Sequence, residues 1–211
     1  MNYLVLKRIL DIIFSLIFIV LTLPLLLLVL LITFFNLGLP LIDIRIPREG
    51  KNKKPFYMYK IRTRIYDQYG NSHYNKISKF IDNTGLNELP QLFNILKGDM
   101  SFIGPRPLLK EYLSFYTPRQ NMRHTIRPGL ECPSLVERDH PRTWEEQFED
   151  DVWYVENINV KTDFRMFCKL FKMVLNKNDS KRRAKASRGY FGAMTIDEIT
   201  KINRGYKESL K

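Results

Sequence analysis

The sequence has 211 residues and a formal net charge of +12, which is enough chain for a membrane element and one compact domain. The positive excess favours an anionic partner such as lipid head groups, nucleotide phosphates or nucleic acid. Two widely spaced cysteines, Cys132 and Cys168, match no metal-binding pattern and exclude a disulfide framework.

The first predicted element is an apolar segment over residues 9–35 that carries Pro24 near its middle. Lys7 and Arg8 precede it and several basic residues follow it within 45–54, so both flanks have the charge expected on the cytoplasmic side. As one helix the segment is long enough to cross a bilayer, whereas each arm beside Pro24 is too short. Two arrangements remain open: one bent span, or a re-entrant helix that breaks at Pro24 and leaves the membrane where it entered.

Residues 1–40 form this predicted membrane element, and residues 41–175 form the predicted domain. The segment 41–66 favours short strands, of which the aromatic and β-branched run 56–63 is the clearest. A polar loop is predicted over residues 67–76.

Helices are predicted through the rest of the domain. In 77–97 the apolar residues recur with the spacing of one buried helical face, so this segment is predicted as a helix that Gly98 ends. Further helices are expected over 108–116, 116–122, 143–154 and 163–175. The basic tail, 176–211, is expected either to contact anionic lipid or to be disordered.

These elements predict a membrane-associated α+β fold, with a small, mainly helical cytosolic domain that contains short β-strands. A nucleic-acid binder is disfavoured, because the basic residues are spread along the chain and the acidic stretch 145–151 interrupts any continuous basic groove. The histidines at 73, 124 and 140 show no ligand spacing and are expected to have no role in a site.

Chemically useful residues are densest between residues 86 and 107. A helix start near Asn87 would attract anions, and Glu88 and Asp99 supply oxygen ligands that suit Mg²⁺. Arg106 stands between two prolines, which would hold its backbone still while its guanidinium binds phosphate. Each also has a simpler explanation: Asn87 as a helix cap, Glu88 as a charge on the helix dipole, Asp99 as a turn residue, and Pro-Arg-Pro as a connector.

Taken together, residues 86–107 resemble the signature of the bacterial sugar transferase family, the monotopic polyprenyl-phosphate phosphoglycosyl transferases. The family pattern reads Leu-Asp-Glu-Leu-Pro-Gln-Leu-x-Asn-Val-Leu-x-Gly-Asp-Met-Ser-x-Val-Gly-Pro-Arg-Pro, and this chain reproduces nearly all of it. Shorter matches to the family lie at Lys7–Asp11, Tyr59–Thr63, Arg127–Gly129 and Phe148–Val155. The resemblance covers residues 3–175.

The resemblance implies a re-entrant helix broken at Pro24 and a monotopic, cytosol-facing enzyme of the bacterial inner (cytoplasmic) membrane. It implies transfer of a sugar phosphate from a UDP-sugar to polyprenyl phosphate (undecaprenyl phosphate), with Mg²⁺ as cofactor and UMP released. That step initiates glycoconjugate or polysaccharide assembly. Membrane lipid is a further expected partner, and a homo-oligomer is left open.

The resemblance also assigns residues. Catalysis is expected at Glu88 and at Asn87, which stands at the position of the family's nucleophile. The metal is expected at Glu88 and Asp99. Phosphate or substrate contacts are expected at Lys60, Arg62, Arg106, Arg127 and Asp151. For Asp151, a surface acid on a helix is an equal alternative.

The chain departs from the family pattern at the nucleophile itself, which in the family is an Asp that forms a covalent phosphosugar intermediate. Asn87 takes its place, and a neutral amide is a poor nucleophile. Asp82 replaces a phosphate-facing Arg, Leu23 replaces a Ser before the membrane proline, and the sequence over 131–138 differs. Three accounts remain: Glu88 replaces the nucleophile, transfer is direct, or the chain is a catalytically impaired member that acts as a membrane-anchored binding or scaffold protein.

Overall fold

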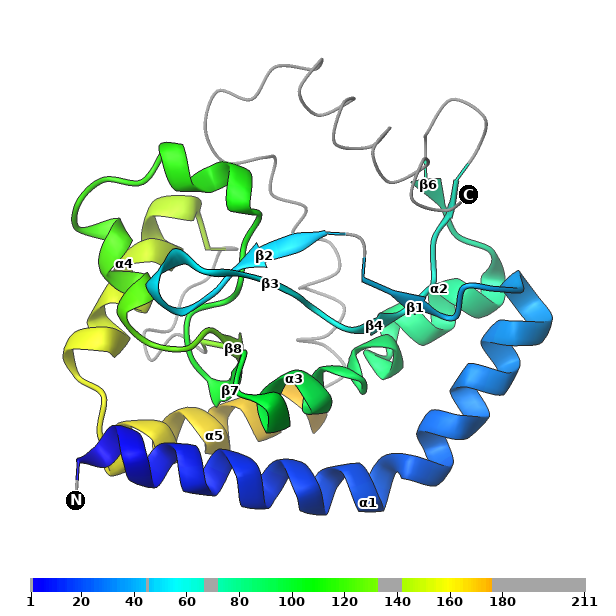
Figure 1. The fold of residues 1–211 in the computed structure, drawn as a ribbon, viewed down its shortest axis with the longest axis horizontal. Helices are drawn as coiled ribbons and strands as arrows, with labels where there is room; N and C mark the ends of the chain where they lie inside the picture. The colour runs from blue at the N-terminus through cyan, green and yellow to red at the C-terminus, as the bar shows by residue number, and fades with distance from the viewer. Residues whose placement is uncertain (1, 45, 67–71, 133–141, 176–211) are drawn as a thin grey trace.

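The computed structural model describes residues 2–44, 46–66, 72–132 and 142–175. One long helix, α1 (Tyr3–Leu37), lies along one side of the domain and bends partway along its length (Figure 1). It is continuous through Pro24, and a proline bends a helix because it lacks an amide donor and crowds the preceding turn. The mean hydropathy of its most apolar 18 residues is 3.1, so α1 is long and apolar enough to cross a membrane.

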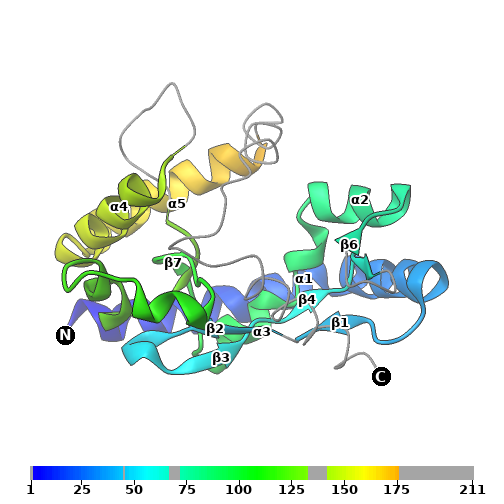
Figure 2. The same cartoon turned by 90° about the horizontal axis from the view of Figure 1, so that it is seen from above.

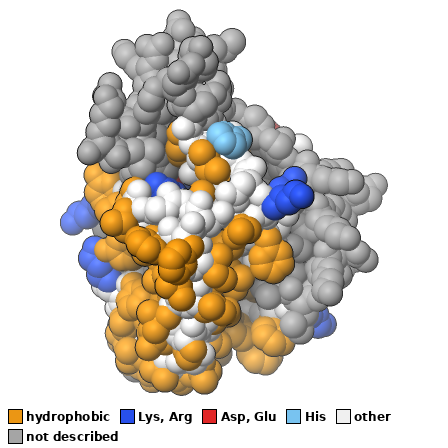
Figure 3. Space-filling view, turned by 90° about the vertical axis from the view of Figure 1, so that its right-hand side faces the viewer, with side chains coloured by type: hydrophobic (Ala, Val, Ile, Leu, Met, Phe, Trp, Pro, Cys, Tyr) orange, Lys and Arg blue, Asp and Glu red, His pale blue; other side chains and the backbone are white. Residues whose placement is uncertain are grey.

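Most of the α1 surface is exposed and apolar, while several of its few polar residues are buried against the domain. Asp11, Ser15 and Thr33 are all buried. Figure 3 shows hydrophobic side chains covering the lower part of one face of the molecule, with Lys and Arg side chains near the margins. In a helix of a water-soluble protein the apolar side would face the domain. The outward apolar surface of α1 is therefore typical of contact with lipid.

Both ends of α1 are fastened to the same domain. Near the N-terminus, Lys7 Nζ lies 2.6 Å from an Asp163 oxygen. The Arg8 guanidinium donates to two backbone carbonyls near the end of α3 (Gln91–Lys97), at 2.6 and 2.7 Å. At the other end of α1, the Arg62 guanidinium donates to the last helical carbonyl and to the two that follow. The two arms of the bent helix therefore share one docking partner.

The strands are short. Among the described residues they form four pairs: β1 (Ile42–Asp43) with β4 (Lys60–Ile61), β2 (Pro47–Glu49) with β3 (Pro55–Tyr57), β5 (Ile65–Tyr66) with β6 (Ser72–His73), and β7 (Ser101–Ile103) with β8 (Gly129–Glu131). The β7–β8 pair is parallel and the other three are antiparallel.

The single strand predicted over 56–63 is wrong, because the chain is interrupted between β3 and β4. The Asn94 side chain accepts from the Tyr59 backbone amide and donates to the Tyr57 carbonyl, each at 2.9 Å. These bonds replace the ladder bonds that would continue the strand.

The helix predicted over 77–97 is also wrong in its continuity. The segment contains α2 (Lys76–Asn83), the 3₁₀ turn η2 (Leu86–Glu88) and α3. Gly85 ends α2 in a left-handed conformation with φ 74°, and Pro90 immediately precedes α3. The chain therefore turns twice within the segment that carries the family motif.

Other predictions agree better with the structure. The helices expected over 143–154 and 163–175 are confirmed by α4 (Trp144–Glu156) and α5 (Val160–Leu175). The two short helices expected between 108 and 122 are 3₁₀ turns, η3 (Lys110–Ser114) and η4 (Gln120–Thr125); a third, η1 (Lys51–Lys53), follows β2. The loop predicted over 67–76 is wrong at its described end, which contains β6 and the start of α2. The tail and most of the 131–138 segment lie outside the described residues.

The main core packs α3, β7, α4 and α5 together, as Figures 1 and 2 show for their ribbons; Ile95, Met100 and Tyr154 are fully buried within it. Gly104 follows β7 and Gly129 begins β8, and their backbones approach so closely that a side chain at Gly129 would collide with the backbone of Gly104. The chain passes directly from Gly104 into Pro105-Arg106-Pro107. Core packing therefore fixes where Arg106 leaves the domain.

Candidate active site

The first part of the candidate site forms where β4 meets η2. Lys60 Nζ lies 2.7 Å from Glu88 Oε1. The two side chains are 26% and 38% exposed, so both reach solvent. A pair this open adds only about 0–1 kcal/mol to stability. Its effect is to hold an ammonium and a carboxylate side by side where a phosphate or a cation can reach them.

Asn87 lies next to this pair and is buried. Its Nδ2 donates to Asp82 Oδ1 at 3.0 Å, and the same oxygen accepts from Thr63 Oγ1 at 3.2 Å. The Asn87 Oδ1 atom is buried without a hydrogen-bond partner among the described residues. The helix-cap explanation of Asn87 is wrong, because the residue lies inside η2 and Pro90 occupies the cap of α3.

Arg106 brings a second cation toward Glu88. Its Nη1 lies 3.1 Å from Glu131 Oε2, and the side chain is 45% exposed. The Glu131 carboxylate raises the pKa of the Arg106 guanidinium, and the charge of Glu88 raises it further. The charge of Glu88 therefore acts on both Lys60 and Arg106.

Two predicted site residues lie at the opposite end of α3. Asp99 accepts from Asn94 Nδ2 at 3.3 Å and pairs with Lys97 at 3.1 Å. Arg127 Nε donates to the Gly98 carbonyl at 2.8 Å. Since the seven residues of α3 alone span about 10 Å, Asp99 and Glu88 are too far apart to bind one metal ion.

Two more predicted site residues, Arg62 and Asp151, contact other parts of the protein and not the Lys60–Glu88 pair in the contacts described here. The Arg62 guanidinium caps the carbonyl end of α1, as described above. Asp151 is fully buried, so its description as a surface acid is wrong. Arg123 donates to one Asp151 oxygen at 3.0 and 3.1 Å, while the other oxygen has no partner among the described residues. Burial raises the pKa of Asp151 to about 6, although Arg123 opposes the shift.

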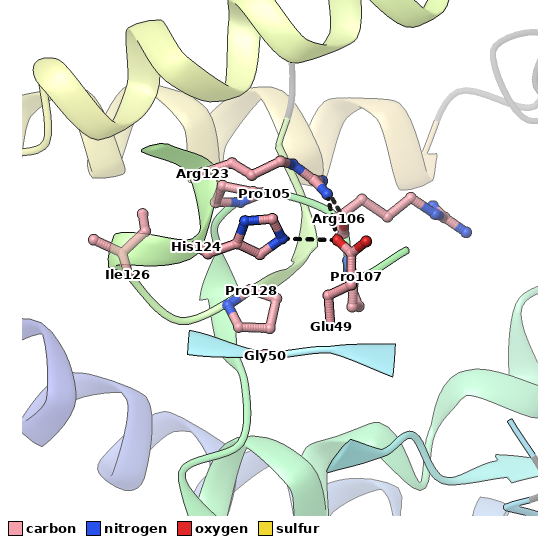
Figure 4. A pocket seen from close by; sticks show the side chains of 9 residues that line it. All are labelled: Glu49, Gly50, Pro105, Arg106, Pro107, Arg123, His124, Ile126 and Pro128. Carbon is pink, nitrogen blue, oxygen red and sulfur yellow. Dashed lines mark hydrogen bonds and ion pairs between the residues drawn. The ribbon is translucent and has the colours of Figure 1, made fainter. Parts of the chain in front are cut away.

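A buried ion cluster surrounds Arg123 (Figure 4), and no motif in the sequence predicted it. Arg123 Nη1 and His124 Nε2 each lie 2.9 Å from the same Glu49 oxygen. Glu49, Arg123 and His124 line a small cavity with the prolines that flank Arg106. Tyr116 completes the cluster through its hydroxyl, 2.9 Å from both Glu49 oxygens. The adjacent Arg123 and His124 were visible in the sequence, but nothing there linked them to Glu49.

A magnesium ion fits the first part of the site. No group of three or more His, Cys, Asp or Glu side chains able to hold a metal occurs in the described part of the chain. Mg²⁺ needs few protein ligands, however, because it is usually bound by one or two carboxylates together with substrate phosphates and water. The Glu88 carboxylate and the unpartnered oxygen of the adjacent Asn87 are donors of the type that Mg²⁺ prefers.

Similarity to known proteins extends over α1 and all the site residues described above. A family model described as bacterial sugar transferase matches residues 2–177. A Bacillus subtilis protein named uncharacterized sugar transferase EpsL is 35% identical over 178 residues, which cover 81% of this chain and 88% of the relative.

Two further relatives have more specific names. The UDP-glucose:undecaprenyl-phosphate glucose-1-phosphate transferase of Klebsiella pneumoniae is 30% identical over 192 residues, or 82% of this chain and 41% of that protein. The undecaprenyl-phosphate galactose phosphotransferase of Salmonella typhimurium is 35% identical over 102 residues, or 48% of this chain and 21% of that protein. The chain thus spans less than half the length of these two relatives.

Proposed function

Because this chain belongs to the bacterial sugar transferase family, we propose that it transfers a sugar phosphate from a UDP-sugar to undecaprenyl phosphate, a polyprenyl phosphate, and releases UMP. The observation that carries the proposal is the exposed Lys60–Glu88 pair, whose carboxylate also raises the pKa of Arg106, within the segment that the family model matches. Relatives named for sugar-phosphate transfer to undecaprenyl phosphate support the reaction class. The identity of the sugar is left open.

The membrane arrangement in this proposal is monotopic, with both ends of α1 on the cytosolic side of the inner membrane. Two observations support it: the bend in a helix that contains Pro24, and the attachment of both helix ends to one domain. A straight span would carry one of these ends about 30 Å away, across the hydrocarbon core. Cysteines placed at positions 2 and 38 should both react with an impermeant maleimide from the cytosolic side only. Labelling of one of them from the outer side would contradict the arrangement.

In the proposed chemistry an oxygen of undecaprenyl phosphate attacks the β-phosphorus of the UDP-sugar directly. The bond from that phosphorus to the bridging oxygen breaks, and UMP leaves with the bond electrons. Lys60 and Arg106 hold phosphate oxygens and offset the charge that develops on them. Direct transfer is favoured because Asn87 is an amide and because Glu88 is already engaged by Lys60.

Mg²⁺ would be held by Glu88 and the Asn87 carbonyl oxygen, where it would neutralise charge on the diphosphate. The Glu88 carboxylate would contact the ion while Lys60 Nζ lies 2.7 Å from its Oε1. The Asp82 carboxylate would orient the Asn87 amide so that its oxygen, and not its nitrogen, faces the ligand.

The proposal is tested by UMP release from the full chain in lipid nanodiscs, with undecaprenyl phosphate and a panel of UDP-sugars. We expect release with at least one sugar, and loss of about 100-fold in Glu88→Gln. Intact-protein mass spectrometry during turnover should detect no phosphosugar adduct. A phosphosugar adduct would contradict direct transfer. If no UDP-sugar in the panel led to UMP release, the proposed transferase activity would be contradicted.

A second function is favoured by one observation, which is the amide at position 87. Under it the chain binds the UDP-sugar or the lipid phosphate without turnover and acts as a membrane-anchored binding or scaffold protein. Calorimetric binding of a UDP-sugar in the absence of UMP release would support this alternative.

A further inference from the structure

We propose that the adjacent residues Asp150 and Asp151 on α4 are positioning residues, which hold Arg106 at both of its ends through two separate arginines. The inference rests on the proposed function, because it assigns Arg106 to the substrate phosphates. Each aspartate acts on Arg106 through an intermediate arginine: Asp151 through Arg123, and Asp150 through Arg142.

The first branch holds the backbone of Arg106. Asp151 is fully buried and accepts two bonds from Arg123, whose side chain is 2% exposed. Arg123 Nη2 in turn donates to the Arg106 carbonyl at 2.6 Å. That carbonyl lies between Pro105 and Pro107, and proline at 107 cannot donate a backbone bond of its own. Arg123 therefore holds the Arg106 carbonyl, and the Gly129 amide holds the neighbouring Pro105 carbonyl at 3.0 Å.

Arg123 is itself held on every side. Its guanidinium lies 5.5 Å from the ring centres of both Tyr116 and Phe148 and bonds Glu49 at 2.9 Å. Burial lowers its pKa, but Asp151 and the other acidic neighbours outweigh burial and the pKa is raised. These contacts leave the Arg123 guanidinium little freedom to move. The position of α4 therefore determines the position of the Arg106 backbone.

The second branch holds the side chain of Arg106. Arg142 Nη1 lies 3.3 Å from Asp150 Oδ2, and Arg142 Nη2 lies 3.3 Å from Glu131 Oε1. The other Glu131 oxygen bonds the Arg106 guanidinium at 3.1 Å. Arg142 and Glu131 are largely buried, with side chains 17% and 11% exposed, whereas the Arg106 side chain is 45% exposed. The chain of contacts therefore runs from the interior outward and ends at the one exposed guanidinium.

The test is a double-mutant cycle, because residues that act through Arg106 lose their effect once Arg106 is gone. In nanodiscs, Arg142→Gln and Arg123→Lys are each expected to lower kcat/KM for UMP release about tenfold. Added to Arg106→Ala, each should change kcat/KM by less than about twofold. Equal losses with and without Arg106 would overturn the proposal, since a purely structural role is additive.

The chain offers a matched control in Arg119, an arginine that precedes η4 and pairs with the same helix, α4. Arg119 pairs with Glu149 and Glu156 of α4, but its side chain is 52% exposed and does not lead to Arg106. Arg119→Gln should leave kcat/KM unchanged. If it lowers kcat/KM as much as Arg142→Gln does, the effect belongs to α4 in general and the proposal fails.

A readout without turnover separates this inference from the proposed function. The Nε–Hε resonance of Arg106, assigned by its loss in Arg106→Lys, should move in Asp150→Asn and Asp151→Asn and stay in place in Arg119→Gln. If UMP release is absent but these shifts occur, the reaction is wrong and the positioning holds. If the resonance is unmoved in both aspartate variants, the positioning is wrong whatever the activity.

Discussion

The amide of Asn87 and the carboxylate of Asp82 form a hydrogen bond of 3.0 Å, which fixes the amide with its nitrogen toward Asp82. The reverse orientation would place two oxygens in contact. The buried Asn87 oxygen is left facing the other way, without a partner among the described residues. Two of the departures from the family pattern are therefore one structural unit.

This unit predicts that Asn87→Asp alone does not restore the family's covalent chemistry. It would place two carboxylates about 3 Å apart, where they cannot both ionise easily near neutral pH. Asp82→Asn combined with Asn87→Asp removes that conflict. Intact-protein mass spectrometry with a UDP-sugar and Mg²⁺ should therefore detect more phosphosugar adduct in the double variant than in the single one. A larger adduct fraction in the single variant would contradict the pairing.

A second prediction compares the two lysine–carboxylate pairs at opposite ends of α3. Lys60→Gln should lower kcat/KM for UMP release about 100-fold, because it removes a cation from the proposed phosphate site. Lys97→Gln breaks the Lys97–Asp99 pair, whose lysine is 63% exposed, and should have little effect. Thermal unfolding should shift little in either variant, since exposed pairs contribute about 0–1 kcal/mol. If Lys60→Gln and Lys97→Gln lowered kcat/KM equally, the substrate phosphates would not bind specifically at Lys60 and this prediction would be wrong.

Arg62 provides a third prediction, because its observed contacts are to the end of α1. Arg62→Gln should lower the free energy of unfolding by about 1–2 kcal/mol through loss of charged bonds to helix carbonyls, and leave the KM for the UDP-sugar unchanged. Arg64→Gln is the control: this exposed arginine bonds Tyr74 and Ser72 at 3.2 and 3.4 Å and not α1, so its loss should leave the KM unchanged and lower the free energy of unfolding less than Arg62→Gln does. An increase in KM in Arg62→Gln would show instead that Arg62 binds substrate, as the family resemblance implies.

The raised pKa of Asp151 leads to a pH dependence of stability. The folded state keeps the Asp151 proton up to about pH 6, whereas an unfolded chain releases it near pH 4. Between these values the folded state binds more protons, so the free energy of unfolding falls as pH rises. Asp151→Asn cannot titrate. The melting temperature of the unsubstituted protein, relative to this variant, should therefore fall between pH 4 and pH 6; a constant difference or a rise would contradict the shift.

The sequence predicted those elements whose causes are local. The helix α4 is capped by Thr143, which exchanges hydrogen bonds with Glu146 in a capping box. The apolar residues of α1 form one unbroken segment of the sequence, and so do the residues of the family motif, so both could be predicted. Lys60, Glu88 and Arg106 were selected because the family motif and one strand contain them. The structure places Lys60 2.7 Å from Glu88, and the role of all three residues in a site stays a prediction.

What the sequence did not reveal depends on long-range contacts. The interruption between β3 and β4 is imposed by Asn94, more than 30 residues away along the chain. The Glu49–Arg123 pair joins residues 74 positions apart, and no periodicity marks either one. Asp99 shares the motif with Glu88, yet the helix between them separates the two, which spacing in a motif does not reveal when the elements are unknown.

The attachment of both arms of α1 has a consequence for how the protein works in its bilayer. With Arg8 bound near the end of α3 and Arg62 bound at the end of α1, the domain cannot rise or sink relative to the helix. If α1 is seated in one leaflet as proposed, the height of the Lys60–Glu88 pair above the acyl chains is set by how deeply the helix apex sits. The length of the surrounding lipid chains would then affect how readily the phosphate of undecaprenyl phosphate, whose prenyl tail is buried in the bilayer, reaches the site.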